Sequence, residues 1–158
     1  MAQAGHIVRR KQDRQVLATQ EDFRATVVRM AASAHRGIAI MTPDLEPEIY
    51  AHPDFLEALK KFILARPFAR TRVLITEPDR ARKTGNEFLE ISRRLNSYIE
   101  FRNLPENEPR HQEAYFIADD NGVVFRPRAD SWNGIADSGA PAVAQMYLET
   151  FDHLWQIS

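Results

Sequence analysis

Short apolar runs alternate with longer amphipathic stretches along this chain of 158 residues, and this alternation limits the folds it can adopt. Residues 38–41 and 73–75 are continuously apolar, which is typical of strands buried on both faces of a parallel sheet. Residues 19–36 and 53–66 carry apolar side chains at intervals of three and four residues, which predicts helices packed against such a sheet. The alternation therefore predicts an α/β domain.

Residues that typically start a helix, end a helix or form a turn define the bounds of most predicted elements. Thr19 is a helix-capping residue and Gly37 a helix stop, while Asp120-Asn121-Gly122 is a hairpin turn between two strands. A loop containing Gly134 and Gly139 is predicted before the last helix. The predicted order is a helix at 19–36, strand 38–41, helix 53–66, strand 73–75, helix from about 85, strand 98–101, strands 114–118 and 123–126, and a final helix from near 141. We expect a mixed, mainly parallel sheet with helices on both faces, ending in a C-terminal hairpin and helix.

Composition narrows the class of protein. Apolar residues make up 44% and charged residues 27% of the chain, which is normal for a globular domain. We divide it into a polar N-terminal arm at 1–18, in which residues 16–17 could join an edge strand, and one domain at 19–158.

The absence of cysteine excludes disulfides and Cys-based zinc sites. We expect a cytoplasmic protein, and a net charge of −1 argues against a membrane partner and makes nucleic acid an unexpected one. A basic cluster at 80–83 is predicted to be a solvated surface.

The segment 111–122 gives a family resemblance. His111 is followed by an apolar strand and then Asp119. Together with the order of elements and the closing residues 151–155, this segment resembles one repeat of the phospholipase D-like superfamily, from about Gly37 to Ser158. In that superfamily the active site lies between two repeats, which come from one long chain or from a homodimer. The resemblance therefore implies a homodimer, or a module of a larger protein.

The residues that carry the family's chemistry differ in this chain. The family motif is His-x-Lys-x4-Asp; a motif anchored on His111 puts Glu113 at the lysine position and Ala118 at the aspartate position. A motif anchored on Asp119 loses both the histidine and the lysine. A carboxylate in place of a cation about 4 Å from a phosphate turns attraction into repulsion of roughly a few kcal/mol at a dielectric near ~20. We therefore expect no enzymatic activity and no cofactor.

Further candidate residues follow from strand ends, because open α/β sheets bind ligands at their carboxyl edges. The arginines there could hold an anionic small molecule such as a phosphate, or could simply pair with neighbouring acids. Trp132 either contacts a ligand or folds back over the sheet. A metal site formed by His111, Glu113 and Asp119 is a further alternative. The predicted ligand-binding residues are His111, Glu113, Arg102, Arg126, Arg128, Asp44 and Trp132.

These patterns predict a catalytically silent phospholipase D-like domain that binds an anionic ligand or a protein partner. One alternative is a phosphodiesterase or nuclease with a rebuilt active site, in which a homodimer brings two His111 side chains into one cleft. Another alternative is a scaffold or dimerisation domain.

Overall fold

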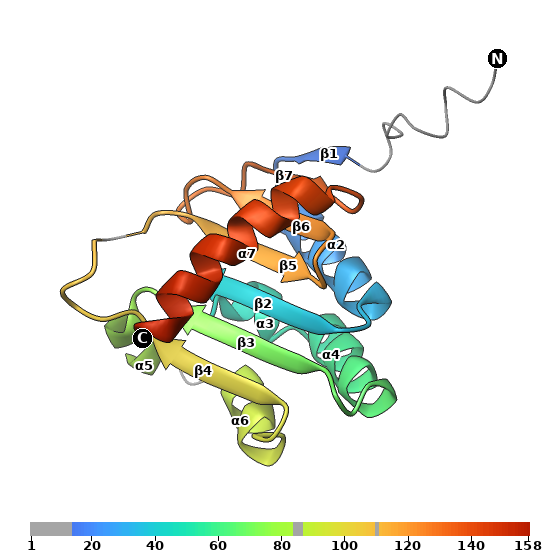
Figure 1. Ribbon diagram of the computed structural model, residues 1–158, viewed down its shortest axis with the longest axis horizontal. Helices are drawn as coiled ribbons and strands as arrows, with labels where there is room; N and C mark the ends of the chain where they lie inside the picture. The colour runs from blue at the N-terminus through green and yellow to red at the C-terminus, as the bar shows by residue number, and fades with distance from the viewer. Residues whose placement is uncertain (1–13, 84–86, 110) are drawn as a thin grey trace.

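The computed structural model describes residues 14–83, 87–109 and 111–158. Seven strands form one sheet in the order β1-β7-β6-β5-β2-β3-β4, which runs from top to bottom in Figure 1. The strands are β1 (Arg14–Leu17), β2 (Gly37–Thr42), β3 (Arg70–Ile75), β4 (Ile99–Asn103), β5 (Ala114–Ala118), β6 (Gly122–Arg126) and β7 (Gly134–Asp137). The helices are α2 (Gln20–Ser33), α3 (Pro47–Tyr50), α4 (Pro53–Ala65), α5 (Pro78–Lys83), α6 (Glu87–Arg94) and α7 (Pro141–Gln156).

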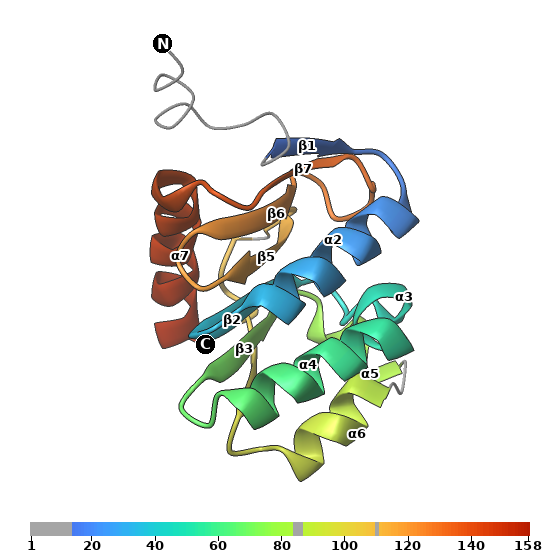
Figure 2. The same ribbon diagram turned by 90° about the vertical axis from the view of Figure 1, so that its right-hand side faces the viewer.

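Helices cover both faces of the sheet. Helices α2, α4 and α6 lie on one side and α7 lies on the other (Figure 2). The first face buries a core that includes Phe23, Phe55 and Phe116, and the second buries a smaller core around Tyr115 and Phe151. Burial of these aromatic side chains supplies much of the driving force for folding. The predicted mixed α/β architecture with flanking helices and a C-terminal helix is confirmed.

The sheet contains more antiparallel pairing than the sequence indicates. Among the described strands, β2–β3 and β3–β4 pair in parallel, while the other four pairings are antiparallel. The predicted hairpin accounts for one antiparallel pair. Strand β7 lies where a loop is predicted, and β1, inside the predicted arm, pairs with it. Gly134 is needed there, because a Cβ would lie 2.4 Å from the carbonyl oxygen of Phe125.

Two further short helices were not predicted. Helix α5 occupies the segment that reads as a polar loop, and α3 follows a turn in which Leu45 and Glu46 have positive φ. The N-terminal residues 1–13 of the predicted arm lie outside the described residues. Within residues 14–83, 87–109 and 111–158, no helix has the length and apolar character needed to cross a membrane.

The strand directions give the sheet two distinct edges. The register aligns Thr42 with Ile75 and Ile75 with Asn103, so β2, β3 and β4 end together. Ala114 pairs with Arg126, which places the start of β5 and the end of β6 at this same carboxyl edge. The opposite, amino edge holds the starts of the parallel strands and the turn between β5 and β6.

Candidate functional site at the carboxyl edge

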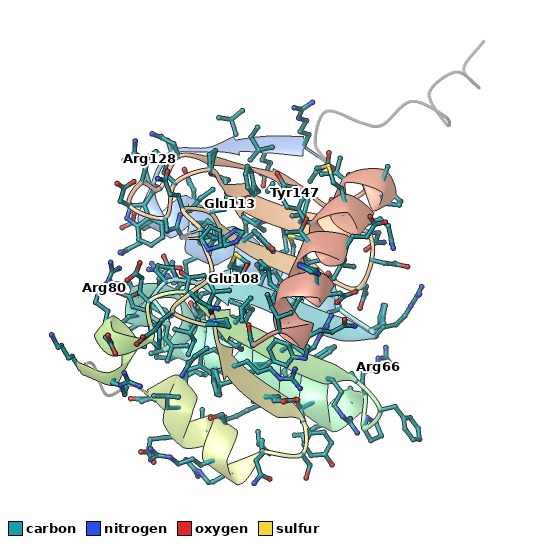
Figure 3. The ribbon with its side chains drawn as sticks, turned by 60° about the vertical axis from the view of Figure 1, so that its left-hand side comes forward. Arg66, Arg80, Glu108, Glu113, Arg128 and Tyr147 are labelled. Carbon is teal, nitrogen blue, oxygen red and sulfur yellow. The ribbon has the colours of Figure 1, made fainter. Side chains whose placement is uncertain are left out.

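A cleft of about 240 Å³ opens at the carboxyl edge of the sheet. Its walls come from the segments after β2, β3 and β6 and from the segment before β5. Figure 3 shows Arg80 and Arg128, from two of these walls, along the same side of the molecule. The lining residues are Pro43, Thr76, Glu77, Arg80, His111, Gln112, Arg128, Ala129 and Asp130.

Backbone hydrogen bonds hold the walls of the cleft together. The amides of Thr76 and Glu77 donate to the carbonyls of Thr42 and Pro43, at 3.0 and 2.7 Å. These bonds continue the β2–β3 pairing past the strand ends. On the other wall, the Ala129 amide donates to the Gln112 carbonyl at 2.6 Å. This bond fixes the loop that carries Arg128 against the segment that carries His111.

His111 lies in the cleft, beside the carboxylate of Glu113. Its Nδ1 atom is 3.6 Å from Oε1 of Glu113, and its side chain is 23% exposed. The sequence predicts His111 and Glu113 as ligand-binding residues, and the structure places their side chains next to each other.

Two arginines reach the cleft, and each is paired with a carboxylate. Arg128 donates to Asp130 with Nη2 to Oδ2 at 2.9 Å, and Arg80 donates to Asp44 with Nη2 to Oδ2 at 3.0 Å. The hydrogen bond between Arg128 and Asp130 raises the pKa of the guanidinium and lowers the pKa of the carboxyl group. Exposed ion pairs of this kind contribute about 0–1 kcal/mol, so an anionic ligand can compete for both guanidinium groups.

Arg126 lies beneath the cleft and is completely buried. Its Nη2 atom is 2.7 Å from Oε2 of Glu46, whose side chain is 7% exposed. The guanidinium also donates to the carbonyls of Ala129 at 2.6 Å and Ser131 at 2.8 Å. The Thr42 hydroxyl donates to the other carboxylate oxygen of Glu46 at 2.9 Å. This buried network joins the turn after β2 to the loop after β6.

Two aromatic rings pack against the Arg126 guanidinium and against each other. The Arg126 guanidinium carbon lies 4.3 Å from the ring centroid of Trp132 and 4.7 Å from that of Phe23. Trp132 is half-buried and packs on the core, as in the second of its two predicted alternatives, while its role as a ligand-binding residue stays a prediction. Trp132 therefore covers Arg126, and Arg126 shapes the cleft from below rather than facing it.

Burial changes the acidity of the groups around this network. It raises the pKa of Glu46 above its ordinary value, and the opposing effects of Arg126 and Thr42 do not cancel this increase. Burial also raises the pKa of Tyr50 well above its ordinary range, with a further increase from the nearby Glu46 carboxylate. Tyr50 therefore remains neutral in the core.

The remaining candidates lie outside the cleft. Arg102 donates to Glu100 and to the Trp155 carbonyl, and its guanidinium carbon lies 4.4 Å from the Trp155 ring centroid. Asp44 does not line the cleft but holds Arg80 at its rim. The sequence places Arg80 in a cluster predicted to be solvated and does not single out Glu46. The local sequence marks Glu46 only as an acidic residue in a turn between two prolines.

Asp119 lies at the amino edge, at the opposite end of β5 from His111. Its carboxylate accepts hydrogen bonds from the backbone amides of His35, Arg36 and Gly37. The alternative metal site that combines His111, Glu113 and Asp119 is therefore wrong, because β5 separates Asp119 from the other two. No cluster of three or more potential ligand side chains occurs within the described parts of the chain.

Solved structures with a similar fold come from several classes of protein. Phosphatidylserine synthase of Haemophilus influenzae is 12% identical with a TM-score of 0.64, and the match covers 90% of this chain and 37% of that one. TrmBL2, described as an archaeal chromatin protein with a novel mode of DNA binding, is 16% identical with a TM-score of 0.60, covering 98% and 57%. NucT from Helicobacter pylori is 11% identical with a TM-score of 0.56, covering 90% and 95%.

These likenesses concern the fold alone. The synthase and NucT both have phospholipase D-like folds, and this chain spans only part of the synthase and of the chromatin protein. No curated protein matches the sequence significantly. The model of a family described as a domain of unknown function (DUF7931) matches residues 19–158, and the chain therefore belongs to that family.

Proposed function

We propose that this chain is a catalytically silent phospholipase D-like domain that binds a phosphate-bearing ligand in the carboxyl-edge cleft. The observation that carries the proposal is the convergence of His111, Arg80 and Arg128 on one cleft, with Glu113 beside the histidine. At about 240 Å³ the cleft is smaller than most sites for drug-sized ligands. This volume suits a phosphate group with a small substituent.

The two guanidinium groups favour an anionic ligand. Arginine presents a planar set of donors that matches two phosphate oxygens at once. Both arginines are held at the cleft by weak exposed ion pairs, so a phosphate can replace Asp44 or Asp130 at little cost. The Thr76 side chain, which also lines the cleft, supplies a hydroxyl donor and acceptor.

The same residues argue against hydrolysis. Transfer of a phosphoryl group through histidine needs a nucleophile, an acid for the leaving oxygen, and cations that neutralise the phosphate. Among the described residues, the cleft lining contains His111 and no lysine. The carboxylate of Glu113 lies where the degenerate motif would place a lysine, and it opposes the build-up of negative charge near His111.

Variants of the cleft arginine test this proposal. Arg128→Gln removes a charged donor, so the affinity for a small phosphate monoester should fall about tenfold. Glu113→Gln should raise the affinity, because it removes a negative charge near the phosphate. Isothermal titration calorimetry measures both changes, and Arg82→Gln, which alters an exposed arginine outside the cleft, should bind like the wild type. Equal affinity of Arg128→Gln and Arg82→Gln would contradict the proposal.

A phosphodiesterase with a rebuilt active site is the second candidate. It is favoured by one observation: the Glu113 carboxylate lies beside Nδ1 of His111, where an acid can orient a catalytic imidazole. One chain brings one histidine to the cleft, so this candidate requires a second copy to bring another. It predicts a dimer in size-exclusion chromatography with light scattering, and phosphodiesterase activity that disappears in His111→Ala. A monomer at micromolar concentration without activity would reject it.

A further inference from the structure

Two large apolar side chains are almost fully exposed at the end of helix α4. Leu64 is 82% exposed and Phe68 is 93% exposed. They are four residues apart, in the last turn of α4 and in the segment that leads into β3 at the amino edge. Single exposed apolar residues need no explanation, but two bulky ones four residues apart at the same edge of the sheet do.

Three hollows adjoin these two side chains and carry arginines or lysines. A hollow of about 230 Å³ between α4 and α6 is lined by Leu64 with Lys60 and Arg94. A hollow of about 400 Å³ is lined by Phe68 with Arg36 and Arg66. Phe68 also borders a third hollow, of about 340 Å³, whose cationic lining residues are Arg36, Arg70 and Arg72. Leu64 and Phe68 are therefore each flanked by cations. Together we call these cations the basic collar: Arg36, Lys60, Arg66, Arg70, Arg72 and Arg94.

The carboxylates near this collar are few and already engaged. None lines the first two hollows. In the third, Asp119 accepts three backbone amides, while Asp120 pairs with Arg36 and Asp152 pairs with Arg72. Among the described carboxylates, none forms an ion pair with the basic residues Lys60, Arg66 and Arg94.

The carboxyl edge has a different charge pattern. A hollow there is lined by Glu77, Asp79, Glu106 and Glu108, and none of the described residues that line it is a cation. Arg93 and Arg94 in the last turn of α6, and Arg66 at the C-cap of α4, complement the helix dipoles, which explains part of the separation. That effect gives no reason for apolar side chains to be exposed among those cations.

We infer that this amino-edge surface docks on a bilayer that contains anionic phospholipids, with Leu64 and Phe68 inserted at the level of the headgroups. Exposed apolar side chains within a basic collar are the combination that binds such a surface, because insertion and charge attraction act together. A net charge of −1 does not reveal this surface, because acidic residues elsewhere, such as those of the carboxyl-edge hollow, offset its cations. The surface lies at the opposite edge from the phosphate cleft, so the inference does not depend on the proposed function.

Other partners fit these residues less well. A single-stranded nucleic acid could stack a base on Phe68, but it would leave the aliphatic Leu64 exposed. A protein partner would need a larger complementary surface than these two side chains offer. A bilayer requires no shape complementarity and accommodates both.

Sedimentation of the full chain with lipid vesicles tests the inference. We expect binding to phosphatidylcholine vesicles that contain phosphatidylglycerol, no binding to phosphatidylcholine alone, and weaker binding as salt increases. Leu64→Ser and Phe68→Ser should each weaken binding on the order of tenfold. Met146→Ser, which removes an exposed apolar side chain from α7, should leave it unchanged. Equal binding to both vesicle types, or Phe68→Ser binding as well as Met146→Ser, would overturn the inference.

Charge variants and a tryptophan probe separate docking from other contacts. The double variant K60Q/R66Q should bind anionic vesicles more weakly than R82Q/K83Q, which removes the same charge from α5. Emission from F68W should be quenched by brominated lipid beyond the quenching seen in the wild type. No additional quenching would overturn insertion. Binding of a single-stranded oligonucleotide that depends on Phe68, or a dimer lost in Phe68→Ser, would assign the surface to another partner and overturn the inference.

Discussion

Replacement of Arg126 by alanine is expected to destabilise the domain by about 3–5 kcal/mol, because it leaves the Glu46 carboxylate buried without its partner. The variant also loses the hydrogen bonds to the carbonyls of Ala129 and Ser131, and Trp132 loses the group it covers. Urea unfolding followed by tryptophan fluorescence measures the change in the free energy of unfolding.

Two further variants make this result specific. Arg128→Ala removes an exposed arginine two residues away, and its free energy of unfolding should change by less than about 0.5 kcal/mol. The double variant E46Q/R126M removes both charges and should recover part of the loss, because no unpaired charge is then left in the core. If Arg126→Ala is as stable as Arg128→Ala, the buried pair does not hold the turn and the loop together.

Replacement of Asp119 by alanine is expected to cost about 2–3 kcal/mol, since its carboxylate satisfies three backbone amides. These amides belong to His35, Arg36 and Gly37 and connect α2 to β2. Asp119 also has φ of 57°, which aspartate tolerates better than alanine. Chemical denaturation gives the energy, and faster hydrogen exchange of the three amides identifies the cause.

A neighbouring acid serves as the control for Asp119. Asp120→Ala removes an exposed carboxylate that contacts Arg36 at 3.5 Å, and it should change stability by less than about 0.5 kcal/mol. Asp119→Ala should bind phosphate like the wild type once folded, because it lies at the opposite edge from the cleft. Unchanged exchange of the three amides in Asp119→Ala would contradict the capping role.

Much of the fold follows from local patterns. The apolar runs predicted β2 and β3, and the Asp120-Asn121-Gly122 turn predicted the β5–β6 hairpin. Strand β7 was missed because its short segment begins with Gly134, a residue that usually marks a loop. Gly134 is required instead by the close approach of the Phe125 carbonyl, and no local pattern encodes that contact.

The site was predictable only in part. His111 and Glu113 are two residues apart, so their proximity in the structure follows from their spacing in the sequence. The role of Arg126 depends on Glu46, which is far away in the chain and meets it only through the fold. The cations of the amino edge likewise come from α4, α6 and the start of β3. The overall net charge does not show that they lie together.

The central claim is that the carboxyl-edge cleft binds a phosphate group without hydrolysing it. Phosphorus-31 NMR of a small phosphodiester incubated with the full chain tests both parts in one measurement. We expect the phosphodiester resonance to broaden or shift with the wild type, to do so less with Arg128→Gln, and to give no monoester resonance over time. A growing monoester resonance that His111→Ala abolishes would contradict the claim of catalytic silence, and a phosphodiester resonance unaffected by the wild type would contradict the claim of binding.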